Sequence, residues 1–145
     1  MSRVRILHLI TGLGLGGAET WLARLLSRLP GERFDCRVVS LLPLSGAHGA
    51  LAGRIRDCGV PVHSLDMARG VPGPAAMLRL MSLLRGWRPQ VLQSWLYHAD
   101  LLGFAARWLC SVGDGGVRPA LSWGVRCAYM DFSRYGLGTR LTVRA

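Results

Sequence analysis

The chain has 145 residues, which is the usual length of a single domain. Half of these residues are hydrophobic, which excludes a disordered chain, and no apolar run is long enough to cross a bilayer. The formal net charge is +10, and all 18 basic residues are arginine. Such a balance arises either from codon drift in a GC-rich genome or from an anion-binding surface, and the sequence leaves both open.

The cysteines do not have the spacing of a metal site. Cys36, Cys58, Cys110 and Cys127 form no Cys-x-x-Cys pair, and the histidines do not complete a zinc-ligand pattern. We therefore expect reduced thiols, no bound metal and a cytoplasmic protein. The N-terminal apolar run does not resemble a signal peptide, because His8 interrupts it and no cleavage site follows.

Short apolar runs alternate with helical stretches along the whole chain. In the first half, the pattern predicts in order a strand over Val4–Ile10, a helix over Ala18–Leu29, a strand over Cys36–Leu42, a short helix over Ala50–Asp57 and a strand over Val60–Leu65. In the second half, it predicts a helix over Pro72–Gly86, a strand over Val91–Leu96, a helix over His98–Leu109 and a strand over Pro119–Val125. This alternation is typical of a Rossmann-like, three-layer α/β domain with a mostly parallel sheet.

Helical spacing also predicts which side chains face the core. On the fourth helix we expect the inward positions to be Leu101, Leu102, Ala105, Trp108 and Leu109.

Beyond Arg126 the alternating pattern is no longer recognisable, with the start of a further helix predicted at Thr139. A doubly wound domain normally packs one more helix there, so we expect the single domain, residues 1–145, to be incomplete at its C-terminal end.

The strongest local signal is a glycine-rich turn between the first strand and the first helix. The segment Gly12–Gly17 reads GLGLGG and satisfies GxGxxG through Gly12, Gly14 and Gly17. Glycines allow close approach of the backbone to a ligand, and the N–H groups of a helix start favour an anion. A dinucleotide site would also need a carboxylate after the second strand, where the chain has Ser40–Pro43. An NAD(P)-type dinucleotide-binding Rossmann domain and a turn with only a packing role remain alternatives.

Three segments in the same order resemble the N-terminal domain of family-four glycosyltransferases, which have the GT-B fold. They are Ile6–Thr20 (ILHLITGLGLGGAET), Gln93–Gly103 (QSWLYHADLLG) and Ser122–Arg126 (SWGVR). The resemblance covers almost the whole chain. It implies a retaining, metal-independent transfer of a hexosyl unit from a nucleotide-sugar to a glycan or lipid-linked acceptor, with no cofactor beyond the donor.

The resemblance also implies roles for particular residues. Gly16 and Gly17 would lie against the donor diphosphate, at the positive end of the first helix. His98 and Arg126 are the candidate catalytic residues at the cleft, where an arginine would hold a phosphate or sugar oxygen. Glu19 stands where the family keeps a glutamate and either supports the site directly or stabilises the first helix. In the same way, Asp100 is expected to support the start of the fourth helix.

In this family the nucleotide is held chiefly by a C-terminal domain, which these 145 residues do not contain. We therefore expect the chain alone to be inactive and to act only with a missing C-terminal domain or a partner chain. Catalysis of this kind needs groups from both sides of the cleft.

Two other surfaces follow from the charge. Nucleic-acid binding is an alternative, although the arginines are scattered and neither a zinc-finger nor an RNA-recognition motif is present. On the third helix, Arg79, Arg85, Trp87 and Arg88 combine basic side chains with an aromatic one. They are either a solvated helix face or a peripheral contact with anionic lipid at the inner face of the plasma membrane, which would suit a lipid-linked acceptor.

Overall fold

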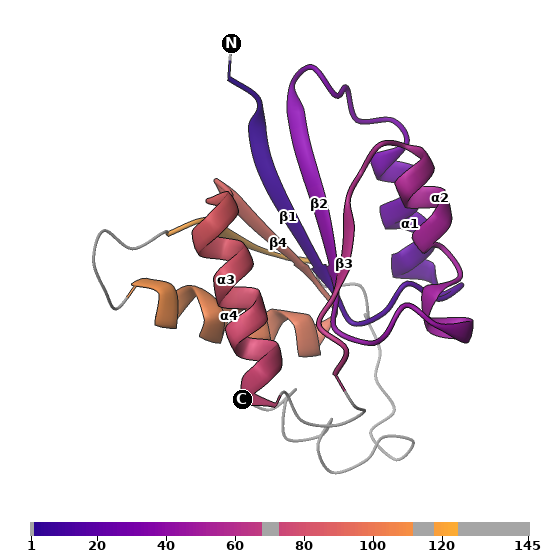
Figure 1. Ribbon diagram of the computed structural model, residues 1–145. Helices are drawn as coiled ribbons and strands as arrows, with labels where there is room; N and C mark the ends of the chain where they lie inside the picture. Colours follow the sequence, from indigo (N-terminus) through magenta and orange to yellow (C-terminus); the bar gives the residue numbers. More distant parts are fainter. Residues whose placement is uncertain (1, 68–72, 112–117, 125–145) are drawn as a thin grey trace.

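The computed structural model describes residues 2–67, 73–111 and 118–124. Within these ranges, five strands alternate with four α-helices and one 3-10 helix, η1 (Figure 1). In chain order they are β1 (Val4–Ile10), α1 (Gly17–Leu26), β2 (Phe34–Ser40), η1 (Gly46–Gly49), α2 (Ala52–Asp57), β3 (Val62–Ser64), α3 (Pro74–Trp87), β4 (Val91–Trp95), α4 (Tyr97–Ser111) and β5 (Ala120–Gly124). The nine strands and helices predicted between residues 4 and 125 are all present, the first with its predicted bounds and the others with ends shifted by a few residues, while the helix predicted to start at Thr139 lies outside the described residues.

All strand pairs are parallel, and the strand order is β3-β2-β1-β4-β5. The chain moves from β1 outward to β3 and then returns to the other side of β1, where it adds β4 and β5. Because such crossovers are right-handed, the two directions place helices on opposite faces of the sheet. Figure 1 shows α1 and α2 together on one face and α3 and α4 on the other. The fold is therefore the Rossmann-like, three-layer α/β class predicted from the sequence.

The alternation of side chains along β1 builds the two cores. Leu7 and Leu9 are fully buried against α3 and α4, while His8 and Ile10 point to the face that carries α1 and α2. Strands with both faces covered read as continuous apolar runs, which is why these segments were recognisable from the sequence. The same alternation places the imidazole of His8 beneath α1.

The predicted inward face of α4 was wrong in most positions. Leu101 is 48% exposed and Trp108 is 58% exposed, whereas the residues buried against the sheet are Ala99, Leu102, Gly103, Ala106 and Cys110. A Cβ on Gly103 would lie 3.4 Å from a methyl carbon of Leu9, so α4 approaches the sheet through its small residues. Close packing selected the small-residue face over the more hydrophobic one.

Candidate functional site

The sheet reverses its connection order between β1 and β4, which is where ligands bind in open α/β sheets, outside the carboxyl ends of the strands. Ile10 is paired with Trp95, so the two strands end side by side. The chain leaves β1 through the glycine-rich turn and leaves β4 through Leu96 into α4. The glycine-rich turn and the segment that carries His98 therefore follow the ends of two adjacent strands.

The glycine-rich turn is held in place by its one buried side chain. Leu13 is fully buried, its N–H donates to the carbonyl of His48 at 2.8 Å, and its carbonyl accepts from the N–H of Leu51 at 2.9 Å. These bonds fix the turn against η1 and the start of α2. Leu15, by contrast, is 79% exposed at the tip of the turn. A buried anchor beside exposed backbone is the arrangement expected of a ligand-binding loop on a rigid scaffold.

Gly14 and Gly17 have different surroundings. A Cβ on Gly14 would lie 3.0 Å from the carbonyl oxygen of Ala47, so packing against η1 requires a residue without a side chain there. A Cβ on Gly17, the first residue of α1, would meet no atom within 4 Å. In the dinucleotide fingerprint the last glycine permits close helix–strand packing. Gly17 has no such packing role, and its backbone faces open space.

Glu19 lies folded over the start of α1. The N-cap residue is Gly16, and a Cβ built there would collide with the Glu19 carboxylate, whose Cδ is 3.0 Å from that position. Glu19 thus places a negative charge at the positive end of the helix dipole. Glu19 therefore lies where a carboxylate would stabilise α1, and any anion bound at Gly16 and Gly17 would meet that carboxylate.

The segment between β4 and α4 contains a strained residue next to His98. Leu96 has a φ of 73°, in the left-handed region that branched and bulky residues rarely adopt. His98 is half-buried, with its ring centroid 4.4 Å from that of Tyr97. Burial lowers the pKa of His98 and thereby favours its neutral imidazole. Strain of this kind gathers at functional sites, where the surrounding structure holds it.

Asp100 ties the start of α4 to the sheet. The hydroxyl of the fully buried Ser94 donates to Asp100 Oδ1 at 2.5 Å. Burial raises the pKa of Asp100, and the hydrogen bond from Ser94 opposes that shift. The N–H of Asp100 also donates to the carbonyl of Leu96 at 3.0 Å. Asp100 therefore links the start of α4 to β4, its supporting role in a site stays a prediction, and Arg126 lies outside the described residues.

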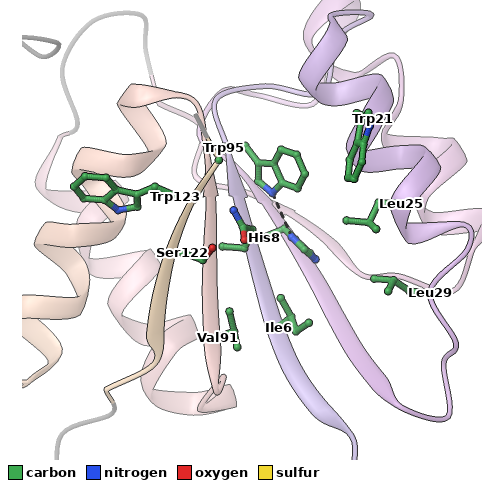
Figure 2. Close-up of a pocket in the computed structure, with 11 residues that line it drawn as sticks. Ile6, His8, Trp21, Leu25, Leu29, Val91, Trp95, Ser122 and Trp123 are labelled. Carbon is green, nitrogen blue, oxygen red and sulfur yellow. Dashed lines mark hydrogen bonds between the residues drawn. The ribbon is translucent and has the colours of Figure 1, made fainter. Parts of the chain in front are cut away.

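Sequence reasoning missed a groove of about 490 Å³ on the α1 face of the sheet, beside α1 (Figure 2). Ile6, Leu25 and Val91 give it an apolar lining, and the buried ring of Trp95 closes its end at the carboxyl edge. The indole N–H of Trp95 donates to His8 Nδ1 at 3.3 Å.

His8 is the unusual group in this groove. It is 3% exposed, burial lowers its pKa to about 4, and among the described residues its Nε2 is buried without a hydrogen-bond partner. Unpaired buried polar atoms are rare in folded proteins. In the sequence, the only sign of this group is that a polar residue stands at a core position of the first strand and interrupts its apolar run.

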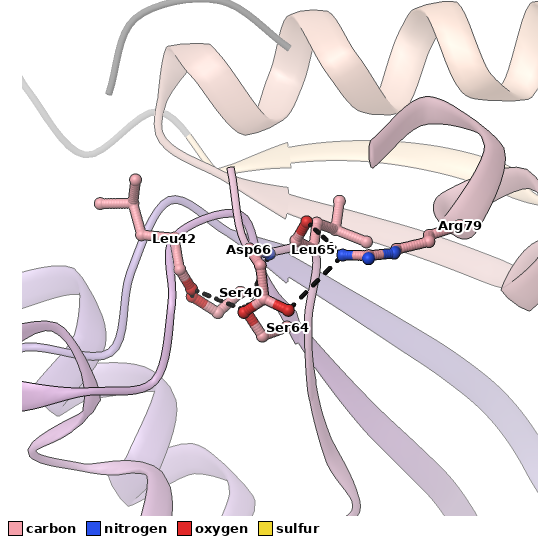
Figure 3. A network of polar contacts seen from close by, with 6 residues as sticks. All are labelled: Ser40, Leu42, Ser64, Leu65, Asp66 and Arg79. Carbon is pink, nitrogen blue, oxygen red and sulfur yellow. Dashed lines mark hydrogen bonds and ion pairs between the residues drawn. The ribbon is translucent and has the colours of Figure 1, made fainter. Parts of the chain in front are cut away.

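A second polar cluster forms at the end of β3 (Figure 3). Asp66, with a φ of 50°, accepts from the hydroxyl of Ser64 at 2.7 Å and from Arg79 Nη1 at 3.5 Å. Arg79 also donates to the carbonyl of Leu65 at 3.1 Å. At the end of β2, where a dinucleotide site needs a carboxylate, the hydroxyl of Ser40 donates to the backbone. Of the described residues in this cluster, the one with a carboxylate is Asp66, after β3.

Within the described part of the chain, no three His, Cys, Asp or Glu side chains gather where they would hold a metal ion, and no helix is long and apolar enough to cross a membrane. Cys36, Cys58 and Cys110 are free thiols, and Cys127 lies outside the described residues. Comparison of the sequence with models of protein families gave no match, and comparison with curated proteins gave none. The fold and the geometry of the strand ends are therefore the basis for any functional assignment.

Proposed function

We propose that the chain is the N-terminal domain of a GT-B glycosyltransferase of the family-four type, which transfers a hexosyl unit from a nucleotide-sugar to a glycan or lipid-linked acceptor. The observation that carries this proposal is the pairing of Ile10 with Trp95, which places two of the three resembling segments side by side at the ends of their strands. Their meeting point is the topological switch point of a Rossmann-like sheet, where this fold binds ligands.

The chemistry of the two strand ends supports the same assignment. The start of α1 is suited to a diphosphate, because a Cβ on Gly17 would meet no atom within 4 Å and because the free N–H groups and the dipole of a helix start both favour an anion. A neutral, half-buried His98 is suited to accept a proton from, or donate a hydrogen bond to, a sugar hydroxyl. Under this proposal the chain alone transfers no sugar, because groups from a second domain complete the cleft.

The dinucleotide-binding alternative has less support. The last glycine of the fingerprint packs closely against the sheet in such domains, yet Gly17 has open space around it. The carboxylate that holds the ribose follows the second strand, yet here the end of β2 carries Ser40, which bonds to the backbone. Gly17 and the residue at the end of β2 therefore both depart from the pattern that defines a dinucleotide-binding motif.

Gly17→Val tests the assignment of the turn. The added side chain meets no protein atom but projects toward the space assigned to the diphosphate. We expect binding of inorganic pyrophosphate, measured by calorimetry at low salt, to weaken at least about tenfold, which is the loss of roughly one charge-assisted hydrogen bond.

Gly53→Val is the matched control, because Gly53 is an exposed glycine of α2 that also has open space around it. Neither variant should lower the thermal midpoint, and Gly53→Val should keep the pyrophosphate affinity of the unchanged protein. If Gly17→Val unfolds the domain, or binds pyrophosphate as well as Gly53→Val does, the assignment of the turn is wrong.

A further inference from the structure

The outer face of α4 carries a row of apolar side chains that stay exposed in the described part of the domain. Leu101 is 48%, Phe104 is 50% and Trp108 is 58% exposed. Their spacing of three and four residues puts them on one side of the helix, away from the small residues that contact the sheet. We call these three residues the α4 stripe. A contiguous exposed apolar row of this kind is often an interaction surface.

The charges around the α4 stripe are almost all positive. Along α3 and α4 the only acidic residue is Asp100, which is half-buried and hydrogen-bonded to Ser94. Burial raises the pKa of the Cys110 thiol on α4, and the positive charge of Arg85 on α3 lowers this pKa by a smaller amount. The charge of Arg85 is therefore close enough to act on α4. Arg107 on α4 donates to the carbonyl of Pro119 and adds a further positive charge to this layer.

The structure also changes which residues of the third helix are available for a lipid contact. Arg79 is engaged by the carboxylate of Asp66 at 3.5 Å, and Trp87 packs against the core with the Arg37 guanidinium 4.5 Å above its ring. Arg85 and the following Arg88, which ends α3, are exposed. The aromatic residue presented to the outside is therefore Trp108 on α4 rather than Trp87 on α3.

We propose that the α4 stripe, together with Arg85 and Arg88, docks this face of the domain on an anionic bilayer surface. Apolar side chains beside guanidinium groups match acyl chains beside phosphates, and tryptophan favours the boundary between them. A second copy of the chain fits less well, because two such faces would bring like charges together. The inference stands on α3 and α4 alone and is independent of the glycosyltransferase assignment.

Co-sedimentation with vesicles of phosphatidylcholine, with and without phosphatidylglycerol, tests the proposal on the full chain. We expect binding only to the anionic vesicles. Each arginine near a charged membrane contributes about fivefold to partitioning, so Arg85→Gln with Arg88→Gln should weaken binding on the order of 25-fold. Replacing Phe104 and Trp108 by alanine should weaken it at least about tenfold.

The matched control is Arg24→Gln with Arg28→Gln, two exposed arginines at the C-terminal end of the first helix. This pair removes the same net charge from the opposite layer, so vesicle binding should stay as in the unchanged protein. Equal loss in the control would reduce the effect to non-specific attraction by the total charge and overturn the proposal. Absence of binding at low salt would overturn it as well, as would a dimer, detected by sedimentation equilibrium, that disappears when Phe104 and Trp108 are replaced. Circular dichroism confirms that each variant is folded.

Discussion

Replacing Glu19 by glutamine has opposite consequences for stability and for ligand binding. The Glu19 carboxylate lies against Gly16 at the start of α1, where it both stabilises the helix and occupies the position assigned to a diphosphate. The substitution keeps the size of the side chain and removes only its charge. Stability should therefore fall while affinity for an anion rises, a combination that a merely structural defect does not produce.

The structure sets the size of both effects. A carboxylate in the first turn of a helix contributes about 0.3–1 kcal/mol through the helix dipole, so the thermal midpoint should fall by about 1–4 °C. For a phosphate bound at Gly16 and Gly17 we assume a separation of about 5 Å from the Glu19 carboxylate, at which Coulomb's law in water gives a repulsion of about 0.8 kcal/mol for each unit of charge. Removing that repulsion should raise the affinity for pyrophosphate about fourfold for each charge.

The assay is calorimetric titration with pyrophosphate at low salt, alongside thermal unfolding. Glu32→Gln is the control, because Glu32 is exposed in the loop after α1 and its replacement changes the net charge equally. The control should leave both the midpoint and the affinity unchanged within about 1 °C and twofold. Weaker pyrophosphate binding by Glu19→Gln would refute the reasoning, since it would mean that Glu19 contacts the ligand favourably instead of competing with it.

Two further predictions concern stability. The pKa of His8 is about 4 in the folded chain and 6.5 in the unfolded chain, so protonation below pH 6.5 favours unfolding. The free energy of unfolding should therefore fall by about 3 kcal/mol between about pH 6.5 and pH 4. His8→Phe should flatten this part of the pH profile, measured by denaturant unfolding. A pH profile as steep in His8→Phe as in the unchanged protein would assign the slope to other groups. Gly49→Ala would place a Cβ 3.0 Å from Leu44 Cα and closer still to the Leu44 carbonyl, so it should lower the free energy of unfolding by about 1–3 kcal/mol in chemical denaturation. Gly53→Ala, at a position of α2 with open space around it, should raise the free energy of unfolding by up to about 1 kcal/mol. Equal effects of the two glycine substitutions would show that η1 rearranges freely.

The candidate site was only partly readable from the sequence. The glycine run and its place between a strand and a helix marked a turn that would approach a ligand, and the structure finds open backbone at Gly17. The conclusion that Glu19 acts on the helix start, and that Gly14 is required by packing, needed the positions of neighbouring groups. Gly14 is constrained by the carbonyl of Ala47, more than thirty residues away in the chain, which no local pattern can indicate.

The sequence by itself determined the order and type of the strands and α-helices and the Rossmann-like class with a mostly parallel sheet, because buried parallel strands and amphipathic helices leave their periods in the chain. Only the tertiary structure decided which face of α4 is buried, since periodicity records hydrophobicity and not how closely a helix approaches its sheet. It also decided that Trp108 is exposed, that Trp87 is covered, and that the unpaired nitrogen of His8 lies in a groove of about 490 Å³. These properties depend on contacts between residues far apart in sequence, whose geometry is set by close packing of the whole domain.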